Sequence, residues 1–412
     1  MELIKQPFQL NLDNTPEIKS AYAIAQSLNE AGYQAVIAGG AVRDLLLGKT
    51  PKDYDIATSA PPEKVLKLFR KTQKVGIAFG VVLVRDFGIA TEVATFRTDG
   101  EYSDGRRPDK VTFTDAASDA QRRDFSINGM FYDFEEKCIL DYVGGLADLK
   151  KEIIRAIRDP HERFKEDYLR MIRAIRFSLT LNFKIEENTF NALKLRSPNI
   201  VDIAPDRIHV ELKKCFSQKI SHHTIKILNE TGLLQYLFKK ADPSSYHLND
   251  HPFNAGGDFT ASLCLLNSAE TSASAVEAAL IAMRCTNEEK RDVKKLFSFK
   301  ENLLSFSSIP IYEQKRTIRQ CDTNRLLFLA LNFGAAQNEI DALEHHIKIW
   351  KQVDLFSPLM PSGKELIAAG LKSDASMGKY MIELENELLE GNLRTKEDVF
   401  QHLESHISKN QA

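Results

Sequence analysis

Two carboxylates separated by one residue are the first candidates for chemistry in this chain. Asp53 and Asp55 flank Tyr54, and side chains at positions i and i+2 of a strand point to the same side. Two carboxylates that converge on one point repel each other unless a cation lies between them. A pair of Mg²⁺ ions about 3.5–4 Å apart can stabilise the attacking and leaving oxygens of a phosphoryl displacement. Asp53 and Asp55 are therefore candidate metal ligands, although glycosyltransferases and many surface turns also carry this pattern.

A glycine pair lies upstream of these carboxylates. Residues 39–44 read GGAVRD and directly follow the apolar run of residues 35–38. Glycine at such a turn lets the backbone approach a ligand closely, and the free N–H groups at a helix start favour phosphate. An ordinary strand-to-helix turn would use the same residues. Asp53 follows Gly40 by 13 residues, with a helix between them. This spacing would place a phosphate-binding turn next to a metal-binding strand.

Short apolar runs bounded by turn residues indicate the strands that must position these side chains. The predicted strands cover residues 35–38, 54–58, 81–84 and 92–96, and helices are expected at about 16–31, 41–48 and 62–70. Glu92 opens the last strand, where it is either a third catalytic carboxylate or an exposed charge on an edge strand. The polar, Gly/Pro-punctuated residues 99–118 predict a mobile loop.

After residue 150 the pattern becomes almost wholly helical. Apolar side chains recur at three- and four-residue intervals, as at Leu169, Ile172, Ile175 and Leu179. The expected fold class is therefore α+β, with a sheet-containing head followed by an all-α remainder.

Length, composition and charge exclude several classes of protein. With 412 residues, 43% hydrophobic and 27% charged, the chain has the balance of a soluble globular protein of about two to four domains. No apolar run reaches about 18 residues and none follows Met1, so neither a membrane span nor a secretory signal is expected. The five cysteines contain no CxxC pair, which indicates reduced thiols, a cytoplasmic location and no structural zinc site.

A local basic patch contrasts with the net charge of −2. Residues 150–176 hold nine Lys or Arg and five Asp or Glu, an excess of four positive charges. Two further basic pairs are Arg106-Arg107 and Arg122-Arg123. A solvated helix face is the plainer interpretation of any one such run. A bound polyanion is the alternative, and in a chain of near-zero net charge only a local patch could hold it.

Five stretches, in this order, resemble the tRNA nucleotidyltransferase/poly(A) polymerase family of the polymerase-β superfamily. They are residues 39–44 (GGAVRD), 52–58 (KDYDIAT), 122–128 (RRDFSIN), 141–149 (DYVGGLADL) and 166–177 (EDYLRMIRAIRF). The resemblance covers about residues 33–216, and departs from the family pattern at Tyr168, where proline is usual, and Ser126, where threonine is usual. It implies a polymerase-β-like nucleotidyltransferase head with a mixed sheet, followed by an all-α neck, body and tail.

The resemblance also implies roles for residues at matching positions. Asp53 and Asp55 would hold two Mg²⁺ ions, and Glu92 remains the candidate third catalytic carboxylate. The implied nucleotide-binding residues are Gly40 and Arg43 at the triphosphate, Arg123 at the sugar-phosphate, and Asp167, Arg170, Arg173 and Arg176 along one helix. The plainer alternatives are a pair between Arg123 and Asp124 and a structural salt-bridge ladder along the helix.

Base selection follows from hydrogen-bonding capacity. Aspartate only accepts and arginine only donates. Cytosine and adenine present an amino donor beside a ring-nitrogen acceptor, whereas uracil and guanine present a carbonyl beside an N–H. A fixed Asp167/Arg170 pair would therefore suit CTP and ATP and reject UTP and GTP without a nucleic-acid template.

The implied activity is the addition of CMP and AMP, from CTP and ATP, to the 3′ end of tRNA. The 3′-OH would attack the α-phosphate in line, with two Mg²⁺ ions, and pyrophosphate would leave. Residues 75–84 (VGIAFGVVLV) favour a tRNA-directed enzyme, and residues 99–108 (DGEYSDGRRP) resemble a loop that CC-adding members shorten. An A-adding tRNA enzyme, a poly(A) polymerase and a non-catalytic RNA-binding protein remain alternatives. The expected partners are tRNA and nucleotides, without a membrane or a stable protein partner.

Four regions are expected from this resemblance. They are a catalytic head (1–150), a base-recognising neck (151–216), an RNA-binding, degenerate HD-like body (217–335) and a tail (336–412). Residues 257–260 and 281–285 stand where some relatives carry a metal-dependent phosphohydrolase, but the histidine–aspartate dyad is missing. Surface or core positions are expected for the histidines at 222, 223, 247, 251, 345 and 346, which show no metal-ligand spacing.

Overall fold

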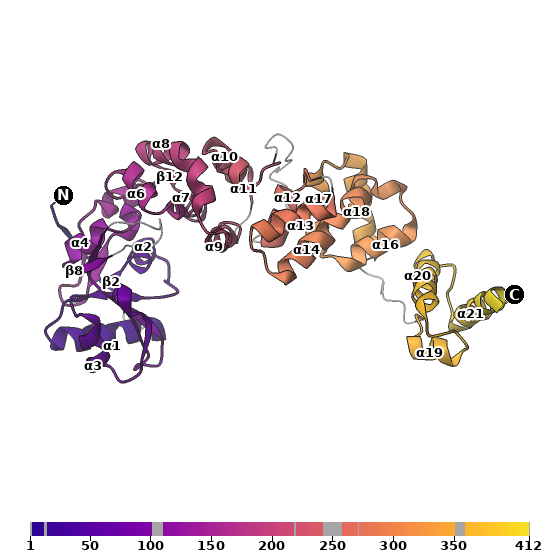
Figure 1. Ribbon diagram of the computed structural model, residues 1–412, viewed down its shortest axis with the longest axis horizontal. Helices are drawn as coiled ribbons and strands as arrows, with labels where there is room; N and C mark the ends of the chain where they lie inside the picture. Colours follow the sequence, from indigo (N-terminus) through magenta and orange to yellow (C-terminus); the bar gives the residue numbers. More distant parts are fainter. Residues whose placement is uncertain are drawn as a thin grey trace. The chain divides into compact units, whose positions relative to one another are not determined.

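The computed structural model describes residues 2–11, 15–100, 110–217, 220–241, 258–270, 272–350 and 359–411. The chain forms two compact units, Met1–Cys215 with Lys226–Leu237, and Phe216–Ile225 with Phe238–Ala412 (Figure 1). The first unit contains sheets and helices, and the described part of the second contains helices only. The predicted α+β fold class is therefore confirmed, whereas the four functional regions stay predictions.

An eight-stranded mixed sheet forms the centre of the first unit, in the order β1-β10-β9-β2-β3-β6-β5-β4. β3 and β6 are parallel, and the other neighbours in this sheet are antiparallel. Its strands are β1 (Ile4–Pro7), β2 (Ala35–Ala38), β3 (Asp55–Thr58), β4 (Thr72–Gly76), β5 (Val81–Val84), β6 (Thr91–Thr95), β9 (Phe131–Asp133) and β10 (Cys138–Asp141). The four predicted strands are confirmed within one residue at each end.

Both faces of the central strands are covered, and for this reason β2 reads as an unbroken apolar run. On one face α1 (Pro16–Glu30) packs against β2, β3 and β6, and α3 (Pro62–Leu68) lies beside it (Figure 1). The opposite face packs against α4 (Ala116–Gln121) through a core that includes Val36, Ala57, Phe96, Ala120 and Phe131. The sheet is thus a rigid platform for the side chains at its strand ends.

The polar stretch after residue 99 is more ordered than predicted. β7 (Arg97–Asp99) pairs antiparallel with β8 (Val111–Phe113), and Asp115 caps α4 by accepting the Ser118 N–H. The prediction of a mobile loop is therefore wrong for residues 110–118, where pairing with β7 overrides a polar sequence. Residues 101–109, nine of the 20 residues of the predicted loop and including the Arg106-Arg107 pair, lie outside the described residues.

Helices dominate the rest of the first unit, but two short strands interrupt them. β11 (Ile153–Ile154) and β12 (Lys184–Ile185) pair in parallel, which corrects the expectation of helices only after residue 150. Each strand has only two residues, too few for a periodic signal. The remaining helices are α2 (Gly40–Leu46), α5 (Gly145–Lys150), α6 (Pro160–Glu166), α7 (Leu169–Leu181), α8 (Glu187–Arg196), α9 (Pro205–Cys215), α11 (Leu233–Leu237) and α10 (His222–Glu230), whose residues are divided between the two units.

The described part of the second unit consists of helices that follow one another along the chain. They are α12 (Phe259–Leu266), α13 (Ala273–Ala282), α14 (Asn287–Ser298), α15 (Lys300–Leu304), α16 (Ile311–Gln320), α17 (Thr323–Phe333), α18 (Gln337–Trp350), α19 (Gly363–Ala368), α20 (Ala375–Glu390) and α21 (Lys396–Gln411). Arg325 pairs with Asp258 and Asp292 and so ties α17 to the start of α12 and to α14. None of the helices in the described part of the chain has the length and apolar character that a membrane crossing requires.

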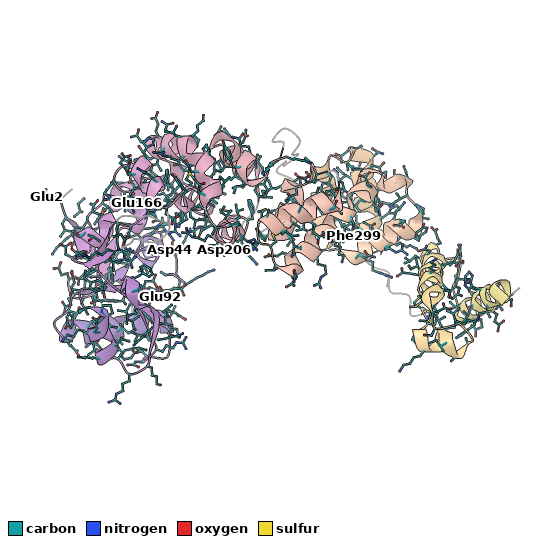
Figure 2. The ribbon with its side chains drawn as sticks, in the orientation of Figure 1. Glu2, Asp44, Glu92, Glu166, Asp206 and Phe299 are labelled. Atoms are coloured by element: carbon teal, nitrogen blue, oxygen red, sulfur yellow. The ribbon has the colours of Figure 1, made fainter. Side chains whose placement is uncertain are left out.

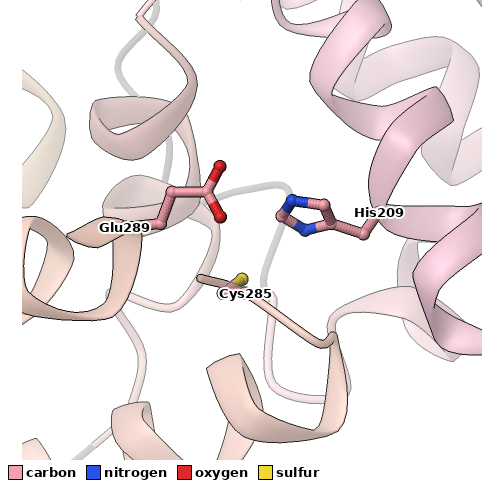
Figure 3. Close-up of side chains that lie close together, drawn as sticks. All are labelled: His209, Cys285 and Glu289. Atoms are coloured by element: carbon pink, nitrogen blue, oxygen red, sulfur yellow. The ribbon is translucent and has the colours of Figure 1, made fainter. Parts of the chain in front are cut away.

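Several polar and aromatic side chains of this unit have structural partners. Figure 3 shows the Cys285 and Glu289 side chains of this unit. Glu289 accepts the Thr286 N–H at 2.8 Å in the capping box that starts α14. His346 is partly buried and stacks on Trp350 with ring centroids 4.4 Å apart. His247 and His251 lie outside the described residues.

Candidate active site

The glycine turn lies directly beside the first aspartates. β2 ends at Ala38, which pairs with Asp55 of β3. Gly39 then adopts φ 73° and ψ −132°, and Gly40 begins α2. A Cβ on Gly39 would stand 3.1 Å from Nη1 of Arg123, so both the backbone angle and the space favour glycine. The predicted strand–turn–helix arrangement is present, and it brings the turn next to Asp55 and Arg123.

Three carboxylates gather at the adjoining strand ends. Asp53 precedes β3, Asp55 is its first residue, and the side chain of Tyr54 between them is buried. The parallel register pairs Ile56 with Val93, which places Asp55 next to Glu92 on the neighbouring strand. Figure 2 labels Glu92. β6 lies between β3 and β5, so the alternative of an edge-strand charge at Glu92 is wrong.

These carboxylates interact unfavourably with one another. The Asp55 carboxyl opens to solvent but is surrounded by a dense shell of protein atoms. Burial, and then the charges of Glu92 and Asp53, raise the pKa of Asp55 to about 6, against the opposing effect of Arg123. Among the described residues, no cationic side chain forms an ion pair with any of the three carboxylates. A bound cation would relieve this repulsion.

A pH dependence of stability follows for the metal-free protein. Because the folded-state pKa of Asp55 lies above the ordinary value of about 3.9, its ionisation destabilises the fold as the pH rises through about 6. In EDTA, Asp55→Asn should therefore raise the thermal midpoint at pH 8, and the gain should shrink at pH 5. Melting curves at both pH values test this, with the exposed Glu63→Gln on α3 as control. An equal gain at both values would contradict the assignment.

A cavity of about 560 Å³ lies next to these strand ends. Eight arginines and four aspartates line it, an excess of four positive charges. Its lining residues are Gly39, Gly40, Arg43, Asp55, Arg97, Asp99, Arg122, Arg123, Asp124, Asn128, Asp167, Leu169, Arg170, Arg173, Arg176, Phe177 and Arg207. All seven predicted nucleotide-binding residues are among them, together with Asp55, whereas Asp53 and Glu92 are not. The cavity thus joins motifs that are up to about 140 residues apart in the sequence.

Phe177 organises three of these arginines. The guanidinium carbons of Arg43, Arg173 and Arg176 lie 5.2, 5.5 and 4.2 Å from the centre of its ring. Arg43 also donates to Asn128 at 2.7 Å and to Asp44 at 2.7 Å. The ring attracts each cation through its quadrupole, at about 0.5–2 kcal/mol per contact. Like charges are therefore held close together and pre-oriented.

The hydrogen-bond partners of Arg123 and Asp124 differ from the alternative that the sequence suggested. Arg123 donates to Asp119, at 2.8 Å, and not to Asp124. Asp124 instead accepts from Nε of Arg173 at 2.9 Å. Burial would raise the pKa of Asp124, but the charge and hydrogen bonds of Arg173, with the N–H of Phe125, hold it at about 2. The alternative of an Arg123–Asp124 pair is wrong because Asp119, one helical turn earlier, lies on the same side as Arg123.

Asp167 does not lie on the same helix as the three arginines that follow it. α6 ends at Glu166, Asp167 has φ −156° and ψ 103°, and α7 starts at Leu169. The prediction of one continuous helix from Asp167 is thus wrong, and the carboxylate leaves the arginine row at the break. Arg207 of α9 donates to both oxygens of Asp167, at 3.2 and 2.7 Å.

Arg170 and Arg176 have partners of their own. Arg170 donates to Glu166 at 2.6 Å and to the carbonyl of Arg163 at 2.7 Å. Figure 2 labels Glu166. Nε of Arg176 lies 2.8 Å from Glu211 of α9. The alternative of a salt-bridge ladder along one helix is therefore wrong, because the partners of these arginines lie on other elements and hold one edge of each guanidinium.

The DxxGG turn has a structural role. The buried Asp141 carboxylate accepts the N–H groups of Val143, Gly144, Gly145 and Leu146, each at 2.9–3.0 Å. Asp148 then accepts the Ser126 hydroxyl at 2.6 Å, which anchors the RRDFSIN segment. The motif does not line the cavity, and it stabilises the RRDFSIN segment, which does.

Sequence reasoning missed several residues of the cavity. Asn128, Arg122, Asp124 and Phe177 lie inside quoted motifs, so those motifs carried a usable signal. Arg97 and Arg207 belong to none of them, and only their charge type marked them, whereas Asp99 opens the quoted loop of residues 99–108. Glu211 supports the site from α9 without lining it.

Three comparisons find similar proteins. The family models "Poly A polymerase head domain" and "Probable RNA and SrmB- binding site of polymerase A" match residues 35–155 and 182–244. The CCA-adding enzyme of Levilactobacillus brevis is 34% identical over 93% of this chain and 97% of its own length. The CCA-adding enzyme of Ligilactobacillus salivarius is 35% identical over 94% and 96%.

Solved structures are similar over nearly the whole chain. The Bacillus stearothermophilus CCA-adding enzyme in complex with CTP has a TM-score of 0.74 at 27% identity, covering 96% of this chain and 99% of that one. The Thermotoga maritima CCA-adding enzyme complexed with tRNA_CCA has a TM-score of 0.72 at 20% identity, covering 95% of each chain, and shows a shared fold.

Proposed function

The chain belongs to the CCA-adding enzyme family, and from that premise we propose that it adds CMP and AMP to the 3′ end of tRNA. CTP and ATP are the substrates, and no nucleic-acid template is needed. The observation that carries the proposal is one cavity that is lined by the glycine turn, Asp55, eight arginines and Asp167. Its volume of about 560 Å³ lies within the usual range of small-molecule sites.

The arginines that line the cavity suit a negatively charged triphosphate. Arg43 and Arg123 flank the glycine turn, and the partners of each fix its orientation before a ligand arrives. Preorganised donors stabilise developing negative charge without reorganising during the reaction. We assign Gly40, Arg43 and Arg123 to the triphosphate and sugar, where they would hold the α-phosphorus for in-line attack by the tRNA 3′-oxygen. The new 3′-O–P bond forms as the bond to the β-phosphate oxygen breaks, and pyrophosphate leaves.

The carboxylate cluster fits Mg²⁺. Asp53 and Asp55 would hold two ions, with Glu92 as the third carboxylate beside them. Oxygen ligands suit this cation. Burial, and then the charges of Glu92 and Asp53, raise the pKa of Asp55, and a bound cation would favour its ionised form. When bound, the ions would supply the charge that stabilises the attacking and leaving oxygens.

Base selection would take place at Asp167 and Arg170, which line the same cavity. Asp167 accepts and Arg170 donates, a pattern that matches the amino group and ring nitrogen of cytosine and adenine. Arg173 and Arg176 would orient the site or contact phosphate, since each is held against Phe177. The helical second unit is assigned to tRNA binding, and the reaction to the cytoplasm, in keeping with five free cysteines.

Primer choice tests this proposal. tRNA transcripts that lack CCA, CA or only A are incubated with labelled CTP and ATP and resolved at single-nucleotide resolution. We expect each to be completed to CCA and extension then to stop. Completion of only the primer that lacks A would identify an A-adding enzyme, and continued A addition a poly(A) polymerase. RNA binding without any extension would indicate a non-catalytic protein.

A further inference from the structure

We infer that Arg207 fixes the carboxylate of Asp167 in the plane that selects the base, and is a specificity-determining positioning residue. The inference rests on the proposed function, because selection presupposes nucleotide addition. Arg207 lies 40 residues after Asp167, on a different helix, and outside every motif that marks the site. Both residues line the cavity.

The contact between the two side chains is bidentate. Nη1 of Arg207 donates to Oδ1 of Asp167 at 3.2 Å, and Nη2 donates to Oδ2 at 2.7 Å. The two side chains are only 16% and 14% exposed, so water screens the pair weakly. A planar guanidinium that holds both oxygens also fixes the plane of the carboxylate, which a lysine cannot do.

The remaining hydrogen-bonding capacity of Asp167 is small. An ionised carboxylate offers about four lone-pair sites. Arg207 occupies two, and the N–H of Leu169 occupies a third, on Oδ1 at 3.1 Å. About one acceptor site is therefore left for a ligand, in a fixed direction. An amino group of cytosine or adenine can use it, whereas a carbonyl of uracil or guanine would face an acceptor.

α9 is built to hold Arg207 in this position. Glu211 follows Arg207 by four residues, so both project from the same side of α9. The Glu211 carboxylate is buried and lies 2.8 Å from Arg176 of α7. From α9, Arg207 thus pairs with Asp167 just before α7, and Glu211 pairs with Arg176 within α7. These two ion pairs align the two helices with each other.

A charge-conserving substitution separates orientation from electrostatics. Arg207→Lys keeps the positive charge but loses the fork, and Arg207→Met also loses the charge. We expect the ratio of kcat/KM for CTP over UTP to fall about tenfold or more in both variants, as loss of a charged hydrogen bond implies. The measurement is steady-state incorporation of all four nucleotides on a tRNA primer, with the thermal midpoint of each variant.

A matched control and a double mutant complete the test. Arg155→Lys disturbs a pair with Asp148 and Glu186 outside the cavity, so its selectivity should stay at the wild-type value. If Arg207 acts through Asp167, Arg207→Lys should cause no further loss of selectivity in an Asp167→Ala background.

Two results would overturn the inference. One is wild-type selectivity in the folded Arg207→Lys protein, and the other is independent, multiplicative losses in the double mutant. Failure of the proposed function itself would look different, because the wild-type protein would then incorporate neither CMP nor AMP.

Discussion

Asp53→Ala and Asp55→Ala should each lower the turnover of nucleotide addition at least about a hundredfold while tRNA binding stays close to the wild-type level. The two carboxylates lie at adjoining strand ends beside Glu92 and form no described ion pair with an arginine. If they hold Mg²⁺ as proposed, loss of either carboxylate would remove charge stabilisation of several kcal/mol from the transition state, and about 2.7 kcal/mol already corresponds to a hundredfold. Tight contact with RNA is not expected of negative side chains, so binding should persist.

Single-turnover extension of a tRNA primer at saturating Mg²⁺, with a filter-binding measurement of tRNA affinity, checks this expectation. Glu63→Gln on α3 removes an exposed carboxylate from the same unit and serves as the control. Turnover above about a tenth of the wild-type rate in either alanine variant would contradict the two-metal assignment.

Asp167→Ala should relax the choice of nucleotide before it affects the chemical step. In the proposed function its carboxylate is the acceptor for the amino group of cytosine or adenine, and one charged hydrogen bond is worth about 1.5–3 kcal/mol, or roughly 10- to 150-fold in selectivity. Incorporation of UMP and GMP should rise relative to CMP and AMP by that factor. Arg173 and Arg176, which are held against Phe177, should instead affect all four nucleotides alike when replaced.

The thermal midpoint separates this effect from a structural one. Asp167→Ala also leaves Arg207 without its bidentate partner, so some loss of stability is expected in addition. Asp167→Asn keeps the shape of the side chain and one acceptor oxygen, and it should retain more stability than Asp167→Ala. An unchanged nucleotide preference in a destabilised Asp167→Ala protein would show that Asp167 is only a salt-bridge partner.

Much of the fold could be predicted because its signals are local. Strands 35–38 and 81–84 are buried on at least one face, and their apolar runs end at glycine or charged residues, so their bounds were predictable. β1 and β4 were not predicted because they are edge strands with polar sequences, IKQP and TQKVG, whose order depends on pairing. β8, with the sequence VTF, was missed because three residues are too few for an alternating pattern, and the strand forms by pairing with β7.

The sequence by itself determined which groups this protein brings to its site. The carboxylate pair, the glycine turn and the arginine row are short patterns, and a short pattern specifies its residue types and its local backbone without help from the rest of the chain. The family resemblance rests on these patterns, and the comparisons over nearly the whole chain agree with it.

Only the tertiary structure decided which charge meets which. Arg123 could pair with Asp119 or Asp124, and Asp167 could follow the helix or leave it, and neither choice is encoded in spacing alone. Asp167 pairs with Arg207, 40 residues away, because the helix ends before Asp167 and α9 packs beside it. The physical reason is that an ion pair forms between whichever opposite charges the packing of apolar faces brings within reach, and arginines far apart in the sequence look alike until that packing is known.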